Sequence, residues 1–134
     1  MNETNTNKMR MIRYYLPALA WIILILFLCT MPASAVPKSG LFDLLHMDKI
    51  VHFFLFGGTV LLLAYGYYRQ KGRISAAALL CLALVVSLYG LGIEFIQKYF
   101  TANRSFEIWD VVADAAGALC GALIFGLIGK RFLK

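Results

Sequence analysis

Four long runs of apolar residues divide the chain, and each is long enough to cross a membrane as a helix. The runs predict spans at residues 14–31, 48–68, 74–100 and 107–129. A spanning helix needs about 20 apolar residues, so four spans joined by short loops use nearly the whole chain. The pattern therefore predicts an all-α integral membrane protein, a four-helix bundle with short loops that forms one domain over residues 1–134.

The break after the first run contains residues that end helices. Pro32 and Pro37 interrupt the chain there, and residues 41–47 are amphipathic enough to lie along the membrane surface. A cleavable signal peptide is an alternative interpretation of the first run, because residues 33–35 have the small-x-small form of a cleavage site. The 18-residue run is longer than a signal-peptide core of about 7–15 residues, which favours a retained helix.

Composition supports the membrane assignment and argues against two other classes. The chain is 61% hydrophobic and 15% charged, whereas soluble domains have about 45–50% apolar and about 25% charged residues. The net charge of +6 is not gathered into one basic run with interleaved aromatic residues, so we expect no nucleic-acid partner. Cys29, Cys81 and Cys120 lie singly in three apolar runs, and we interpret them as small core residues.

The distribution of basic residues predicts the orientation of the bundle. Lys and Arg in short loops favour the cytoplasmic side of a membrane. With the N-terminus inside, nine of the thirteen basic residues fall in cytoplasmic segments, and six of the seven acidic residues fall toward the outer side. We therefore expect both the N-terminus and the C-terminus to be cytoplasmic.

Polar side chains concentrate at the predicted outer ends of the last three spans. Ionisable groups cost about 2.5–3.5 kcal/mol each inside a membrane, so they point by default to function. Residues four apart on a helix share a face, as do residues three apart. Helices two, three and four each carry such a pair at this end, and Arg104 lies in the loop between two of them. The predicted binding cluster is Asp48, Lys49, His52, Glu94, Gln97, Arg104, Asp110 and Asp114.

Several of these residues also have a simpler interpretation. Asp48 and Asp110 can act as helix caps that complement the dipole, and Lys49 and Lys98 can anchor the chain at the headgroups. Glu107 is expected to be only exposed.

Glu94 and Asp114 lie deeper in their helices than a cap requires. We expect Arg104 and His52 to neutralise them in a buried network. Such a network can also serve mainly to specify how the helices pack.

The last span contains small residues at every fourth position. Ala113, Gly117 and Gly121 form one such series, which lets a helix backbone approach its neighbour closely. Packing within the chain and dimerisation both fit this pattern. Trp109, Tyr99 and Phe100 fit an aromatic belt at the outer interface.

The order and spacing of these short motifs resemble the VanZ-like family of membrane proteins, which is associated with resistance to the glycopeptide teicoplanin. The resemblance covers about 100 residues and rests on DKIVHF at 48–53, EFIQ at 94–97, RSF at 104–106, and Asp110 followed by DAAG at 114–117. It implies a four-helix protein of the bacterial cytoplasmic membrane. Asp114 departs from the family pattern, in which Asn is common, and adds an ionisable group to the cluster.

The leading functional hypothesis is a module that binds or remodels an envelope amphiphile, with Arg104 contacting an anionic headgroup. The partner is then a membrane lipid or another envelope amphiphile. Oligomeric state stays open. No cofactor or metal ligand is assigned.

Two alternatives use the same residues. In a membrane-embedded enzyme, His52, Glu94 and Asp114 are the candidate acid and base groups, and a divalent metal on Asp48, His52, Asp110 or Asp114 is conceivable. In a purely structural module, the cluster clamps the helices together. A transporter is disfavoured because the polar residues lie at one membrane face and not at the midplane.

Overall fold

The structure is a computed structural model that describes residues 3–36, 40 and 46–133. Its long helices are α1 (Glu3–Cys29), α3 (Met47–Lys71), α4 (Ala76–Phe100) and α5 (Ile108–Ile124). A short 3-10 helix η1 (Ala33–Ala35) follows α1, and α5 continues through a π-helical turn η2 (Phe125–Gly129) into α6 (Lys130–Phe132).

The described part of the chain contains four helices that are long and apolar enough to span a membrane, and it contains no strand. The prediction of an all-α membrane protein with four helices is therefore confirmed. Of the expected surface segment 41–47, residues 41–45 lie outside the described residues, and Met47 already belongs to α3.

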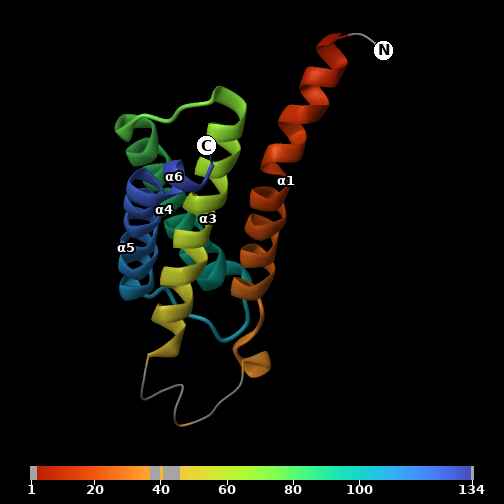
Figure 1. The fold of residues 1–134 in the computed structure, drawn as a ribbon. Helices are drawn as coiled ribbons and strands as arrows, with labels where there is room; N and C mark the ends of the chain where they lie inside the picture. Colours follow the sequence, from red (N-terminus) through yellow and green to blue (C-terminus); the bar gives the residue numbers. More distant parts are fainter. Residues whose placement is uncertain (1–2, 37–39, 41–45, 134) are drawn as a thin grey trace.

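The helices run alternately up and down the bundle. The described ends of the chain and the turn between α3 and α4 lie at one end, and the loop between α4 and α5 lies at the other, beside the C-terminal end of α1 (Figure 1). The turn at the first end has clear helix-end residues. Gly72 adopts a left-handed conformation (φ 71°) and ends α3, and the Ser75 hydroxyl accepts a hydrogen bond from the Ala78 N–H at 3.1 Å to begin α4.

Helices α3 and α5 make the closest packing in the bundle, and glycines allow it. A Cβ atom on Gly121 would lie 2.5 Å from the Gly57 carbonyl oxygen of α3, and one on Gly57 would lie 2.9 Å from the Gly117 carbonyl oxygen of α5. These are backbone atoms that cannot rotate away. The small residues of the last helix therefore pack within the chain, which was one of the two interpretations of their spacing.

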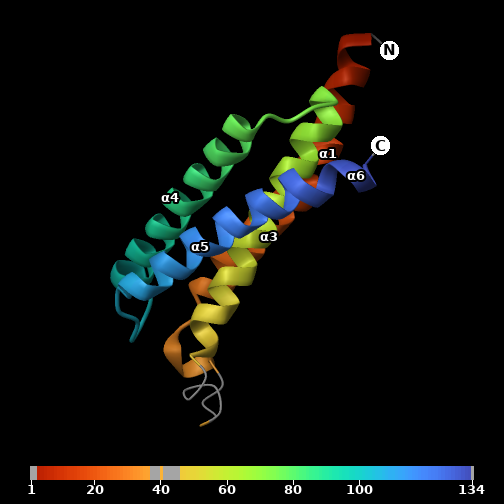
Figure 2. The same ribbon diagram turned by 60° about the vertical axis from the view of Figure 1, so that its left-hand side comes forward.

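Helix α1 lies along α3 (Figure 2), and it is attached by hydrogen bonds of polar side chains as well as by the buried Ala18, Ile25 and Cys29. The Trp21 indole N–H donates to the Leu55 carbonyl at 2.9 Å, and the Tyr15 hydroxyl donates to the Gln70 side chain at 2.8 Å. The Tyr89 hydroxyl of α4 donates to the Ile22 carbonyl at 3.0 Å. Long-range hydrogen bonds therefore fix the register of α1 while much of its apolar surface stays exposed.

Many large apolar side chains face outward, as expected for helices in lipid. Phe54, Leu84 and Leu123 are each more than 60% exposed.

The interpretation of the cysteines as core residues is correct for Cys29, which is buried, but wrong for Cys81, which is exposed; Cys120 is half-buried. A lipid-facing position is as apolar as a core position, so an apolar run does not reveal which of its residues point inward.

Candidate functional site

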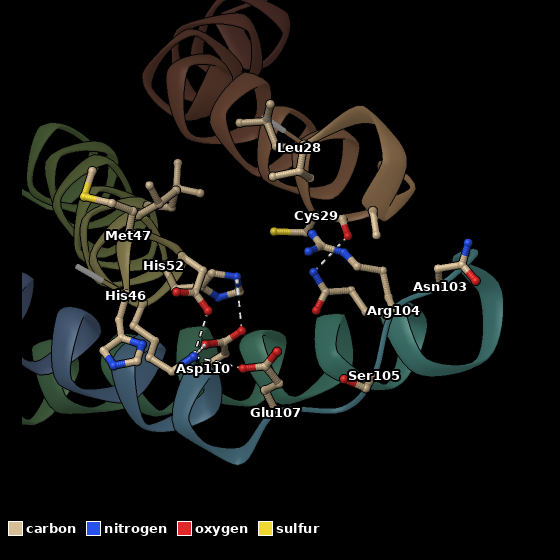
Figure 3. A pocket seen from close by; sticks show the side chains of 17 residues that line it. Leu28, Cys29, His46, Met47, His52, Asn103, Arg104, Ser105, Glu107 and Asp110 are labelled. Atoms are coloured by element: carbon tan, nitrogen blue, oxygen red, sulfur yellow. Dashed lines mark hydrogen bonds and ion pairs between the residues drawn. The ribbon is translucent and has the colours of Figure 1, made fainter. Parts of the chain in front are cut away.

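A pocket of about 530 Å³ opens at the end of the bundle where α1 ends and α3 and α5 begin (Figure 3). Its walls come from α1, α3, α4, α5 and the loop before α5. Most of the predicted cluster lines it, whereas Glu94 and Asp114 are completely buried and are not lining residues. The cluster residues on its wall are Asp48, Lys49, His52, Gln97, Arg104 and Asp110.

His52 and Asp114 form a buried pair between α3 and α5. The His52 Nδ1 atom lies 2.8 Å from Asp114 Oδ1, and Asp114 is 0% exposed. His52 is therefore placed to neutralise Asp114, as the sequence predicted. Its other ring nitrogen, Nε2, lies 3.9 Å from Asp110 Oδ2, and the ring stacks on Phe56.

Lys49 lies at the centre of a second group of carboxylates. Its Nζ atom is 2.7 Å from Asp48 Oδ2, 2.9 Å from Glu107 Oε2 and 2.9 Å from Asp110 Oδ1. The interpretation of Lys49 as a headgroup anchor is therefore wrong, because its ammonium group is held by three carboxylates from two helices. Lys98 is different: it is exposed and lies over the Tyr99 ring at 5.1 Å.

The same contacts explain the two aspartates that were considered as caps. The N-cap positions of α3 and α5 are His46 and Glu107, and neither makes a side-chain capping bond. Asp48 and Asp110 occupy the first turns of these helices, where a negative charge complements the helix dipole, but both carboxylates bind Lys49.

Glu94 connects α4 to the beginning of α5. Its Oε2 atom accepts a hydrogen bond from the backbone N–H of Glu107 at 2.9 Å, and its Oε1 atom is buried without a hydrogen-bond partner among the described residues. Glu107 is exposed, as expected, but it is not only exposed. Its side chain binds Lys49 and its N–H binds Glu94. In the sequence, the one sign that Glu107 contributes to the site was its position at the beginning of the last apolar run.

Arg104 does not neutralise Glu94 or Asp114, contrary to the prediction. Across the described part of the chain it makes no hydrogen bond or ion pair, and its Nε atom is buried without a partner. The side chain extends from the loop toward Cys29 at the end of α1, on the other side of the pocket from His52 and Asp110 (Figure 3). The loop backbone decides this direction, and the spacing of charges along the sequence does not report it.

Gln97 lies in the pocket but is bonded to the first helix. Its side-chain Nε2 donates to the Cys29 carbonyl at 2.9 Å, and this carbonyl at the end of α1 has no partner within its own helix. Gln97 therefore connects α4 to α1 beside Arg104.

Two sets of side chains in the described residues bring ligand atoms within 4.8 Å of one another: His52, Glu94 and Asp110, and Asp48, Glu107 and Asp110. The sequence had suggested a different set for a metal, namely Asp48, His52, Asp110 or Asp114. The structure keeps His52 and Asp110 together but brings Glu94 to them in place of Asp48 and Asp114, because Asp48 binds Lys49 while Asp114 binds the Nδ1 side of His52.

The fold and the site together define a class: a multi-pass α-helical membrane protein with an ionisable cluster buried at one end of the bundle. The family model described as VanZ/LLP1 matches residues 2–129. The chain belongs to this family, as its motifs predicted.

A curated relative provides a second comparison. An uncharacterized protein of Schizosaccharomyces pombe is 33% identical over 113 residues, which cover 84% of this chain and 62% of the relative. The chain thus spans less than two thirds of that relative's length. No solved structure matches the chain significantly.

Proposed function

We propose that this protein binds the anionic headgroup of an envelope amphiphile in the pocket, with Arg104 as the main contact. The supporting observation is that Arg104 lines the pocket and has no ionic partner among the residues described. A guanidinium in a partly buried site needs acceptors, and a phosphate or carboxylate supplies two in parallel. A bound headgroup meets that need.

The composition of the pocket wall favours an amphiphile over a fully polar ligand. Leu28, Val51 and Leu55 contribute apolar surface, and Arg104 contributes a positive charge that, unlike that of Lys49, is not paired with a carboxylate of the described residues. The pocket lies at the ends of membrane-spanning helices, where headgroups meet acyl chains. A ligand with an anionic head and an apolar tail fits both parts of this wall.

Replacing Arg104 by alanine is expected to lower the amount of anionic amphiphile that co-purifies with the protein in mild detergent. A hydrogen bond to a charged group is worth about 1.5–3 kcal/mol, so retention should fall about tenfold or more. Arg104→Lys keeps the charge but loses bidentate contact, and we expect an intermediate value. Mass spectrometry of extracted lipids measures the change.

Lys98→Ala is the matched control for this experiment. It removes one exposed positive charge near the same end of α4 but lies outside the pocket lining, so it should leave lipid retention unchanged. Equal retention by wild type and Arg104→Ala, with helix content preserved by circular dichroism, would contradict the proposal. An equal loss in Lys98→Ala would show that only surface charge matters.

We also propose that the protein resides in the bacterial cytoplasmic membrane with both termini in the cytoplasm, which directs the pocket to the outer leaflet. The asymmetry of Lys and Arg supports this orientation. A fusion of alkaline phosphatase to the C-terminus should be inactive in cells, whereas a fluorescent protein at the same end should mature. An active phosphatase fusion would reverse the orientation.

A role in teicoplanin resistance belongs to the same proposal, because the VanZ part of the family description supports it. The Arg104 variants test it directly. Cells that express the wild type should tolerate more teicoplanin than cells that express Arg104→Ala, at equal protein levels. Equal tolerance would show that the pocket does not contribute to resistance. The conclusion about lipid binding would be unaffected, because it rests on the separate lipid measurement.

A further inference from the structure

Three residues from three different helices direct ligand atoms toward one point beside the pocket. His52 of α3, Glu94 of α4 and Asp110 of α5 each offer one ligand atom, and these atoms all lie within 4.8 Å of one another. Three ligands bound to one ion by bonds of about 2.0–2.3 Å lie about 3–4 Å from one another, and His52 Nε2 already lies 3.9 Å from Asp110 Oδ2. The three side chains are therefore close to coordination distance.

Each of these three side chains has two polar atoms, and another residue of the protein binds one of the two. Asp114 binds His52 at Nδ1 (2.8 Å), Lys49 binds Asp110 at Oδ1 (2.9 Å), and the Glu107 N–H binds Glu94 at Oε2 (2.9 Å). The atoms left are His52 Nε2, Asp110 Oδ2 and Glu94 Oε1. A carboxylate on the far nitrogen of a histidine is the usual outer support of a metal ligand.

Glu94 provides an independent indication of a missing partner. The residue is 0% exposed, and its Oε1 atom has no hydrogen-bond partner in the described chain. Buried carboxylate oxygens are normally paired or bound to a metal.

The local charge balance points the same way. Five carboxylates of the described residues lie in or beside the pocket, whereas Lys49 and Arg104 are the permanently positive side chains among the described residues that line it, and Arg104 pairs with none of the five. A divalent cation reduces this excess of negative charge.

We propose that His52, Glu94 and Asp110 bind a divalent transition-metal ion, with Asp114 as the support that orients His52. One imidazole nitrogen and two carboxylate oxygens suit Zn²⁺ or Mn²⁺ better than Mg²⁺ or Ca²⁺, which prefer oxygen ligands alone. His52 and Asp110 line the pocket, so the ion enters from there.

The second set of possible ligands is not the site. The Nζ atom of Lys49 already lies within 2.9 Å of Asp48, Glu107 and Asp110, so an ammonium ion occupies the position that a metal would take. Asp48 and Glu107 therefore serve as controls for the proposed site, because they are nearby carboxylates that bind the Lys49 ammonium group and not the proposed metal ion.

This inference goes beyond headgroup binding and can fail separately from it. A metal ion bound by His52, Glu94 and Asp110 adds a second positive centre, on the side of the pocket away from Arg104. An anionic headgroup can contact both this ion and Arg104. Metal uptake is nevertheless measured without lipid. Arg104→Ala should leave it unchanged even though it lowers lipid retention.

The test is metal binding by the full-length protein after removal of metal with EDTA in detergent. We expect the stripped wild type to take up one Zn²⁺ or Mn²⁺ ion per chain, measured by calorimetry and by elemental analysis after gel filtration. Glu94→Gln preserves the acceptor for the Glu107 N–H and removes the charge, and its affinity should fall at least about tenfold. Asp48→Asn should bind like the wild type.

Asp114→Asn provides a second, less disruptive variant if Glu94→Gln does not fold. It keeps a side-chain oxygen beside His52 but removes the charge, so we expect unchanged stoichiometry with affinity lowered about 10–100-fold. Absence of saturable Zn²⁺ and Mn²⁺ uptake by the stripped wild type would overturn the proposal. So would loss of uptake in Asp48→Asn with retention in Glu94→Gln.

Discussion

Gly117→Ala is expected to separate α3 from α5 and to destabilise the protein by about 3 kcal/mol or more, the upper end of the cost of overpacking. A Cβ atom at Gly117 would overlap the carbonyl oxygen of Phe53 in α3. The oxygen belongs to the α3 backbone and the position of the Cβ is fixed by the α5 backbone, so no side-chain rotation removes the overlap and the two helices must move apart. Membrane helices depend on close packing for association, and the loss is therefore large.

Denaturation of the purified protein in mixed micelles measures this effect. Gly92→Ala is the control, because a Cβ at Gly92 meets no atom within 4 Å. Alanine favours helix by about 0.5–1 kcal/mol over glycine, so this variant should be as stable as the wild type or slightly more stable. Equal stability of Gly117→Ala and Gly92→Ala would mean that α3 and α5 do not pack as described.

His52→Leu is expected to destabilise the metal-free protein by about 3–5 kcal/mol, the usual result of removing one partner of a buried ion pair. Asp114 is 0% exposed, and its Oδ1 atom would lose the 2.8 Å contact to His52 Nδ1. Its Oδ2 atom already has no partner among the described residues. The carboxylate would then be buried with neither oxygen bonded. The measurement is again denaturation in mixed micelles, in EDTA.

The double variant His52→Leu with Asp114→Leu is the control for that result. Replacing both partners by apolar groups of similar shape can be nearly neutral, so most of the lost stability should return. A single variant as stable as the wild type would contradict the buried pair. A stable double variant that no longer takes up metal would show that the cluster does more than clamp the helices.

The Arg104 and His52 variants therefore address different parts of one site. Arg104 lines the pocket without an ionic partner in the described chain, and its removal should change binding while folding is kept. His52 is buried and paired, and its removal should change folding and metal uptake together. The two outcomes distinguish a ligand site from an architectural cluster.

The second and third predicted spans match the observed helices closely, whereas α1 begins at Glu3, well before the predicted start at residue 14, because its polar first turns continue the helix ahead of the apolar run. Each spanning helix needs about 20 apolar residues, and an apolar run of this length can be recognised directly in the sequence. The predicted span 48–68 corresponds to the observed helix Met47–Lys71, and the predicted span 74–100 corresponds to Ala76–Phe100. The depth of Glu94 and Asp114 was predictable for the same reason, since both lie inside an apolar run and not at its edge.

The partners of the charged residues were only partly predictable. Helical spacing placed His52 near Asp114 once the helices were assumed to meet. The role of Lys49 was not visible, because its three carboxylates come from two helices and Glu107 looked like an exposed residue. Arg104 was assigned to the wrong partners, because a loop residue has no periodicity that fixes its direction.

The sequence by itself thus determined the class of protein, the number and approximate limits of its helices, and which end of the bundle carries the ionisable groups. These depend on hydrophobic length and helical period, which are local properties of the chain. Only the tertiary structure decided that His52, Glu94 and Asp110 converge while Arg104 stays apart. Convergence depends on how three helices rotate about their axes, and contacts such as that of Gly117 with Phe53 fix this rotation.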